Sequence, residues 1–209
     1  ADESISMIAE VKQAVKWVSS IPAVKLGFIG MAVIHFLFMP MIFVGIPVWA
    51  KQNFVEGAYV FGMVTAAYGM GAFLGAISAG YLKGPDDKNL IPYMFWAYVF
   101  SGSTLALIVF YKAYWWAMLL FFIAGGFDTY FYVHFTTWLQ RITPESLLGR
   151  VMSVLMLMSM GLLPVADGIM GFAIDVSLNL TMVLSALFLM IFCSLVALNP
   201  RARITAQKS

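Results

Sequence analysis

The chain has 209 residues, of which 62% are hydrophobic and 11% are charged. Soluble domains carry roughly a quarter charged residues, so this composition excludes an ordinary soluble domain and indicates a protein that lies in a membrane. The formal net charge is only +2, and the basic residues are spread between apolar blocks, which argues against a nucleic-acid partner.

The first segment, residues 1–22, predicts an amphipathic helix on the cytoplasmic surface of a membrane. Charged and polar residues occupy one side of it, and Trp17 lies near its end, where an indole ring prefers the lipid headgroup region. A soluble linker helix is the alternative. The apolar residues of the segment recur every three or four positions and form one stripe, at Ile8, Val11, Val15 and Val18.

Residues 23–199 contain six apolar blocks, each long enough to cross a bilayer core that takes about 20 helical residues. Continuous apolar blocks favour helices over the alternating strands of a β-barrel. The polar breaks between the blocks are short, so neighbouring helices run antiparallel. The predicted fold is therefore an all-α membrane protein with six transmembrane helices. The blocks are Leu26 to Ala50, Ala58 to Leu82, Leu90 to Tyr111, Tyr114 to Leu139, Val151 to Ile174 and Leu178 to Leu198.

The basic residues predict the orientation of these helices, because loops rich in Lys and Arg stay in the cytoplasm. If the N-terminus is inside, only Lys51 and Lys112 fall on the outer side. We therefore expect both termini, and a tail of residues 200–209, in the cytoplasm. The basic residues on the inner side are then Lys12, Lys16, Lys25, Lys83, Lys88, Arg141, Arg150, Arg201, Arg203 and Lys208.

The second block carries a small residue at every fourth position on one helix face. Small residues let two helix backbones approach closely, so we expect this stripe to pack against another helix. Direct contact with a substrate is the alternative. The stripe consists of Ala67, Gly71, Gly75 and Ala79.

Prolines interrupt two of the predicted helices. Pro40 and Pro47 lie in the first block and Pro164 lies in the fifth. Each removes a backbone donor and frees a carbonyl group, so we expect kinks at these positions. Transporters build central sites around such broken helices, although a kink with a packing role only is an equal alternative.

Ionisable residues inside the apolar blocks are the strongest indication of mechanism, because an unpaired charge in hydrocarbon costs several kcal/mol. Asp128 lies about 20 Å into the fourth block and His35 about 14 Å into the first from the opposite side, so the two are placed to face each other across a cavity. Both groups can bind and release a proton as access to water changes. The structural alternative is that Asp128 bonds to Tyr132 and each histidine merely packs. The candidates for proton coupling are Asp128, His35, His134 and Asp167.

Soft and aromatic side chains near these charges suit a bulky apolar ligand, and they suit lipid contact equally. The candidates for the substrate cavity are Met39, Phe131 and Tyr132. The sequence has no Gly-rich phosphate loop, no pair of histidines four residues apart and no cysteine cluster. We therefore expect neither an enzyme nor a metal or other cofactor.

The segment Gln140 to Ser153 reads Gln-Arg-Ile-Thr-Pro-Glu-Ser-Leu-Leu-Gly-Arg-Val-Met-Ser. It resembles the cytoplasmic linker between the tenth and eleventh helices of major facilitator superfamily exporters, of the enterobactin exporter and macrolide efflux type. Thr143 is expected to cap a short helix that Pro144 opens, with an acid at its positive end. The motif residues are Gln140, Pro144, Glu145, Gly149 and Arg150.

The resemblance covers nearly the whole chain and implies that the six spans are helices seven to twelve of a twelve-helix fold. It implies two inverted three-helix repeats and a partner, a second homologous six-helix half that rocks against this one around a central site. That half would belong to the same polypeptide, a separate subunit or a second copy. Since the chain opens on Ala1 rather than Met, we expect it to be processed or excised.

The resulting prediction is half of a secondary transporter in a bacterial cytoplasmic membrane. The resemblance implies that its first and fourth spans line the cavity, and Asp128 is the candidate for the coupling carboxylate. The predicted activity is proton-coupled export of a small amphiphilic compound by alternating access. Import is left open, and the alternative function is a transporter-like scaffold that binds another membrane complex without transporting.

Overall fold

The computed structural model describes residues 2–203, with side chains from residue 9 onward. Lys208 and the predicted tail beyond residue 203 lie outside the described residues. The described part is helical without any strand, which confirms the predicted all-α fold. Its elements are α1 (Asp2–Ser20), α2 (Pro22–Leu37), η1 (Met41–Gly45), α3 (Ile46–Asn53), α4 (Gly57–Tyr81), α5 (Asp87–Phe110), α6 (Tyr114–Ile142), α7 (Glu145–Met156), η2 (Leu157–Gly161), α8 (Leu163–Leu198) and η3 (Pro200–Ala202).

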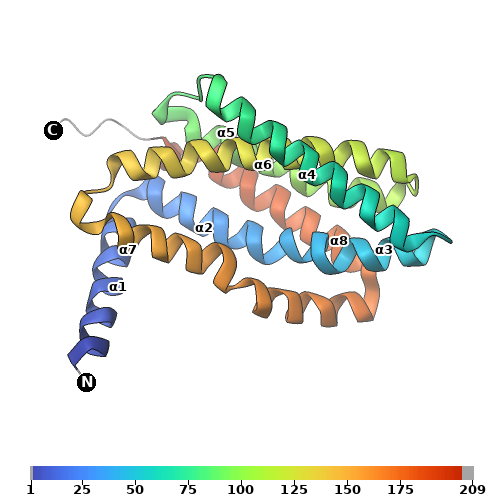
Figure 1. Cartoon of the computed structure of the whole chain (residues 1–209), viewed down its shortest axis with the longest axis horizontal. Helices are drawn as coiled ribbons and strands as arrows, with labels where there is room; N and C mark the ends of the chain where they lie inside the picture. Colours follow the sequence, from blue (N-terminus) through green and yellow to red (C-terminus); the bar gives the residue numbers. More distant parts are fainter. Residues whose placement is uncertain (1, 204–209) are drawn as a thin grey trace.

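Five continuous helical segments of the described chain are long and apolar enough to cross a membrane. The last of them, Glu145–Leu198, has 54 residues, more than twice the length of one crossing. It turns back on itself within α8, so that its two parts run antiparallel (Figure 1). Together with Pro22–Asn53, α4, α5 and α6, the segment makes six crossings.

The reversal within α8 occurs at Ser177, whose backbone is extended with φ −165° and ψ 107°. The Ser177 hydroxyl oxygen accepts a hydrogen bond from the backbone nitrogen of Leu180 at 3.4 Å, as a serine does at the start of a helix. The Thr181 hydroxyl donates to the Ala173 carbonyl oxygen at 2.8 Å across the turn. These bonds satisfy backbone groups that lose their helical partners at the turn. The turn lies between the fifth and sixth predicted blocks.

The first and fifth spans each contain a wider, π-helical turn beside a predicted proline kink. The turn η1 follows Pro40 and precedes Pro47, and η2 precedes Pro164. Proline has no backbone N–H to donate, so the pattern of backbone hydrogen bonds around it shifts by one residue or more. The π-helical turns accommodate such shifts. In η2 the Ser159 hydroxyl donates to the Leu155 carbonyl oxygen at 2.9 Å.

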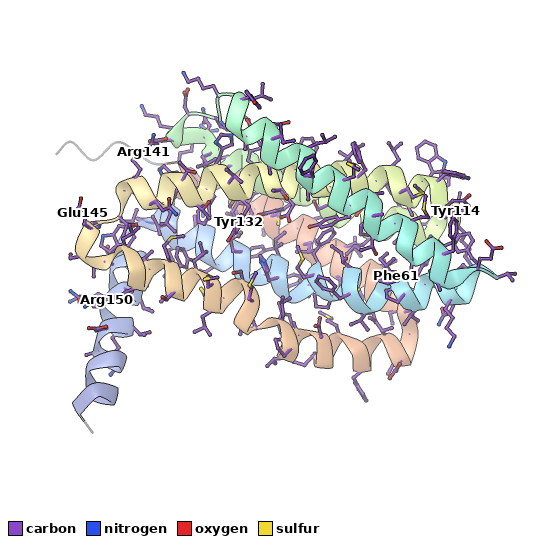
Figure 2. All side chains as sticks on the ribbon, in the orientation of Figure 1. Phe61, Tyr114, Tyr132, Arg141, Glu145 and Arg150 are labelled. Carbon is purple, nitrogen blue, oxygen red and sulfur yellow. The ribbon has the colours of Figure 1, made fainter. Side chains whose placement is uncertain are left out.

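The spans run side by side along the long axis of the molecule (Figure 1). The most extensive packing joins α4 to α6 and α5 to α8. We call one end of the bundle the α1 end, because it carries α1 and the α4–α5 and α6–α7 connections. Figure 2 shows Arg141, Glu145 and Arg150 at the α1 end, and Phe61 and Tyr114 at the opposite end.

Candidate functional site

The helices α4 and α6 contact each other through their backbones. A β-carbon at Gly71 would overlap the carbonyl group of Phe122, and one at Gly75 would overlap the carbonyl group of Gly126. Only residues without a side chain allow this approach. The predicted stripe lies along this side of α4, where its glycines are buried and its alanines half-buried: Ala67, Gly71, Gly75 and Ala79.

The same contact fixes the position of Tyr68. A β-carbon at Gly125 on α6 would overlap the backbone carbonyl group of Tyr68 on α4. The Tyr68 ring also packs edge-on against Phe121, with 6.4 Å between ring centroids. Gly125 lies three residues before Asp128 on α6. The close backbone contact at Gly125 therefore brings the Tyr68 side chain near Asp128.

A hydrogen bond joins α4 and α6 halfway across the bundle. The Tyr68 hydroxyl donates to Oδ2 of Asp128 at 2.9 Å. Asp128 lies at the midpoint of α6 and Tyr68 lies one residue from the midpoint of α4. The carboxylate is half-buried and points at another helix. Its hydrogen-bond partner is therefore Tyr68, and the alternative of a bond to Tyr132 within α6 is not observed.

Two further spans bring polar groups to the same level. Tyr98, at the centre of α5, is 1% exposed and donates from its hydroxyl to Sδ of Met31 on α2 at 3.3 Å. His35 Nδ1 donates to the Met31 carbonyl oxygen at 2.8 Å, which leaves Nε2 as the nitrogen that can bind another proton. His35 lies near the middle of the Pro22–Asn53 span, so His35 and Tyr98 lie at about the same depth as Asp128.

We call this group of side chains the midspan cluster. We include Tyr132, which is half-buried and lies one turn after Asp128 on α6 (Figure 2). Sequence reasoning found three of its residues and missed Tyr68 and Tyr98. The overlooked signal is a tyrosine in the middle of an apolar span, since membrane tyrosines are enriched at the interfaces. The cluster consists of His35, Tyr68, Tyr98, Asp128 and Tyr132.

His134 lies apart from the midspan cluster, beneath the loop between α4 and α5. Its ring lies 4.5 Å from the ring of Tyr130, centroid to centroid, and a β-carbon at Gly84 in the loop would overlap it. Its Nε2 is buried and has no hydrogen-bond partner within the described part of the chain. The structure therefore places His134 against the loop.

An ion pair joins the start of α5, directly after this loop, to α6. The Arg141 guanidinium donates to Oδ1 of Asp87 at 2.5 Å, and both side chains are more than half exposed. A cavity of about 330 Å³ lies between the loop and α6, and His134, Lys83 and Arg141 are among its lining residues. Exposed pairs of this kind contribute little stability, about 0–1 kcal/mol, so the fit of Gly84 onto His134 matters more for the position of the loop.

Gly84→Ala is expected to destabilise the protein, because the new methyl group would overlap the His134 ring. Overpacking of this kind costs about 1–3 kcal/mol, which would lower the midpoint of thermal unfolding in detergent. In a His134→Ala background the same change is expected to cost almost nothing, because the ring is gone. Additive effects of the two substitutions would show that the loop does not rest on His134.

The remaining candidates do not bond to the midspan cluster. Asp167 on α8 is half-buried, and its Oδ1 has no hydrogen-bond partner within residues 2–203. Met39, between α2 and η1, is half-buried. Phe131 is 9% exposed and packs edge-on against Tyr130, with 5.2 Å between ring centroids.

The sequence motif after α6 connects three elements at the α1 end. Arg150 on α7 donates to Oε1 of Glu10 and to Oε1 of Gln13, each at 2.9 Å, and so ties α7 to α1. The predicted cap by Thr143 is wrong, because its hydroxyl donates backwards to the Leu139 carbonyl oxygen at 2.6 Å and satisfies the end of α6. The other motif residues are exposed: Gln140, Pro144, Glu145 and Gly149.

No curated protein and no solved structure matches the chain. One family profile does match it, over residues 4–208, and its description is transmembrane secretion effector, of the major facilitator (MFS) type. The match extends over nearly the whole chain, including every span and the midspan cluster. The chain therefore belongs to the transmembrane secretion effector family of major facilitator transporters.

Proposed function

We propose that this chain is one half of a proton-coupled exporter, and that Asp128 binds the coupled proton. Membership in a transporter family supports a transport function of this general type. The observation that carries the finer proposal is the Tyr68–Asp128 hydrogen bond at the middle of two membrane spans. Secondary transporters place their substrate and ion sites at this depth.

Placing a carboxylate at this depth costs free energy, and a purely structural role would not require a carboxylate there. An ionisable side chain in the hydrocarbon region is expensive, and it persists where it lines a water-filled path or pairs with another group. Asp128 is half-buried and receives a hydrogen bond from Tyr68. Ionised, its carboxylate accepts this bond, and after it binds a proton it can also donate one. Proton binding thereby alters the bonding between α4 and α6.

The uncovered surface of α4 and α6 supports a second six-helix half as partner. In the most apolar stretch of α4 only 22% of the residues are buried, and in α6 only 28%, whereas the value for α5 is 50%. These two helices also carry Tyr68 and Asp128. A second half would cover part of this exposed surface, and a small amphiphilic compound would pass between the two halves. The binding site of this compound would then be lined by aromatic and methionine side chains.

Tyr68→Phe tests this function, because it keeps the ring and removes the hydroxyl that donates to Asp128. The assembled transporter would be placed in vesicles, and a pH gradient would drive export of a fluorescent amphiphilic dye. We expect a several-fold lower rate of export for Tyr68→Phe. Tyr93→Phe, on an exposed tyrosine of α5, serves as the control and should leave the rate unchanged.

Equal rates for the two variants would show that the Tyr68–Asp128 bond plays no part in transport. An assembled protein that moves no compound under any gradient, but copurifies with another membrane complex, would favour the scaffold function instead.

A further inference from the structure

The helix α1 lies across the end of the bundle, whereas the spans run along it (Figure 1). One side of α1 packs against the bundle, where Ala14 is 0% and Val18 is 6% exposed. The Arg150 bonds to Glu10 and Gln13 hold it in this position. If the spans cross a bilayer, α1 therefore runs parallel to the membrane surface.

A second side of α1 is covered by no described part of the chain. Val11 and Val15 are 44% and 45% exposed, and they lie one turn apart on the same side of the helix. Lys12 and Lys16 are exposed and follow next to them around the helix. We call these four residues the outer face of α1. It combines a narrow apolar strip with a basic edge.

The charge of the outer face is positive. Glu10 is the one acidic residue of α1 with a described side chain, and it pairs with Arg150. Asp2 and Glu3 belong to the first turn of α1, about two turns away from Val11 along the helix. Lys25 and Arg203, at the same end of the bundle, are exposed as well. Among the described side chains, neither Lys12 nor Lys16 has an acidic partner, so both face outward.

We propose that the outer face of α1 binds anionic lipid headgroups at the membrane surface. An amphipathic helix in the interfacial plane buries its apolar strip at the acyl boundary and directs its lysines at the phosphates. Two valines are too few to draw a free helix out of water. The spans already hold α1 beside the bilayer, however, so binding occurs at a high effective concentration of lipid.

The exposure of a spin label at Val15 tests this proposal. Val15→Cys would be labelled in the full chain with Cys193→Ala, and the protein would be placed in vesicles of neutral phospholipid or of a neutral and anionic mixture. We expect the label to collide more often with oxygen, which enters the membrane, than with a water-soluble nickel chelate. This preference should increase with anionic lipid, and Lys12→Gln with Lys16→Gln should remove the increase. Lys51→Gln, an exposed lysine at the opposite end, is the matched control and should leave it intact.

Three results would overturn the proposal. A label that mainly meets the nickel chelate would show that α1 is a solvated linker. A label shielded from both reagents would show that a protein segment covers the outer face. A preference for oxygen that does not change with anionic lipid would show that Lys12 and Lys16 bind no headgroups. None of these results depends on transport. The proposal can therefore be tested separately from the function of Asp128.

Discussion

Replacing Asp128 with asparagine is expected to reduce proton-driven export to the level of vesicles without the transporter. Asparagine has nearly the same shape, and its amide oxygen can still accept the hydrogen bond from Tyr68. It cannot bind or release a proton, however. The change therefore removes the titratable group and leaves the contact between α4 and α6 in place. The measurement is the rate of dye export under an imposed pH gradient.

Two controls separate lost coupling from lost structure. Asp175→Asn alters an exposed acid beside the turn at Ser177 and should export at the normal rate. Exchange of the dye at equal pH on both sides should persist in Asp128→Asn, because this exchange needs no net proton movement. If Asp128→Asn instead keeps full proton-driven export, the coupled proton binds elsewhere and the proposed role of Asp128 is wrong.

Gly125→Ala is expected to separate α4 from α6 and to destabilise the protein. The new β-carbon would overlap the carbonyl group of Tyr68, so the two backbones must move apart. Overpacking in a tight contact costs about 1–3 kcal/mol, and the midpoint of thermal unfolding in detergent should fall accordingly. Export should also fall, because the displaced Tyr68 hydroxyl no longer reaches Asp128.

The adjacent glycine provides a matched control. A β-carbon at Gly126 would lie 3.5 Å from the Gly71 carbonyl oxygen, which is ordinary van der Waals contact. Gly126→Ala should therefore leave stability unchanged or raise it slightly, since alanine is favoured over glycine in helices by up to about 1 kcal/mol. Equal losses of stability at the two positions would contradict the observed contact, in which Gly125 alone of this pair faces the Tyr68 carbonyl.

The six spans were predictable because hydrophobic length alone determines them. Each apolar block falls within one helical segment, apart from Leu82 and Tyr111, which lie just past the ends of α4 and α5. The turn at Ser177 lies between the fifth and sixth blocks. The breaks between blocks are shorter than expected, because helix extends into them. The largest difference follows the fourth block, where only two residues separate α6, which ends at Ile142, from α7, which begins at Glu145. Polar composition marks where a helix leaves the membrane, but it does not mark where the helix ends.

The partners of the polar groups were not predictable, because they come from other helices. Counting residues placed Asp128 near the middle of its span. The only hydrogen-bond partner considered for it, as the structural alternative, was Tyr132, one turn away on the same helix. The actual partner, Tyr68, is 60 positions away in the sequence, and its approach depends on Gly125. The position of His134 likewise depends on a loop that packs over it through Gly84. Such contacts follow from helix packing, which periodicity within one helix does not specify.

The central claim is that Asp128 lies on a water-filled path that opens to each side of the membrane in turn. Its most direct test is the reaction of Asp128→Cys, with Cys193→Ala, towards a membrane-impermeant thiol reagent applied to one side of the assembled transporter at a time. We predict reaction from both sides, with a transported compound changing the ratio of the two rates. A cysteine at this position that reacts from neither side would contradict the claim.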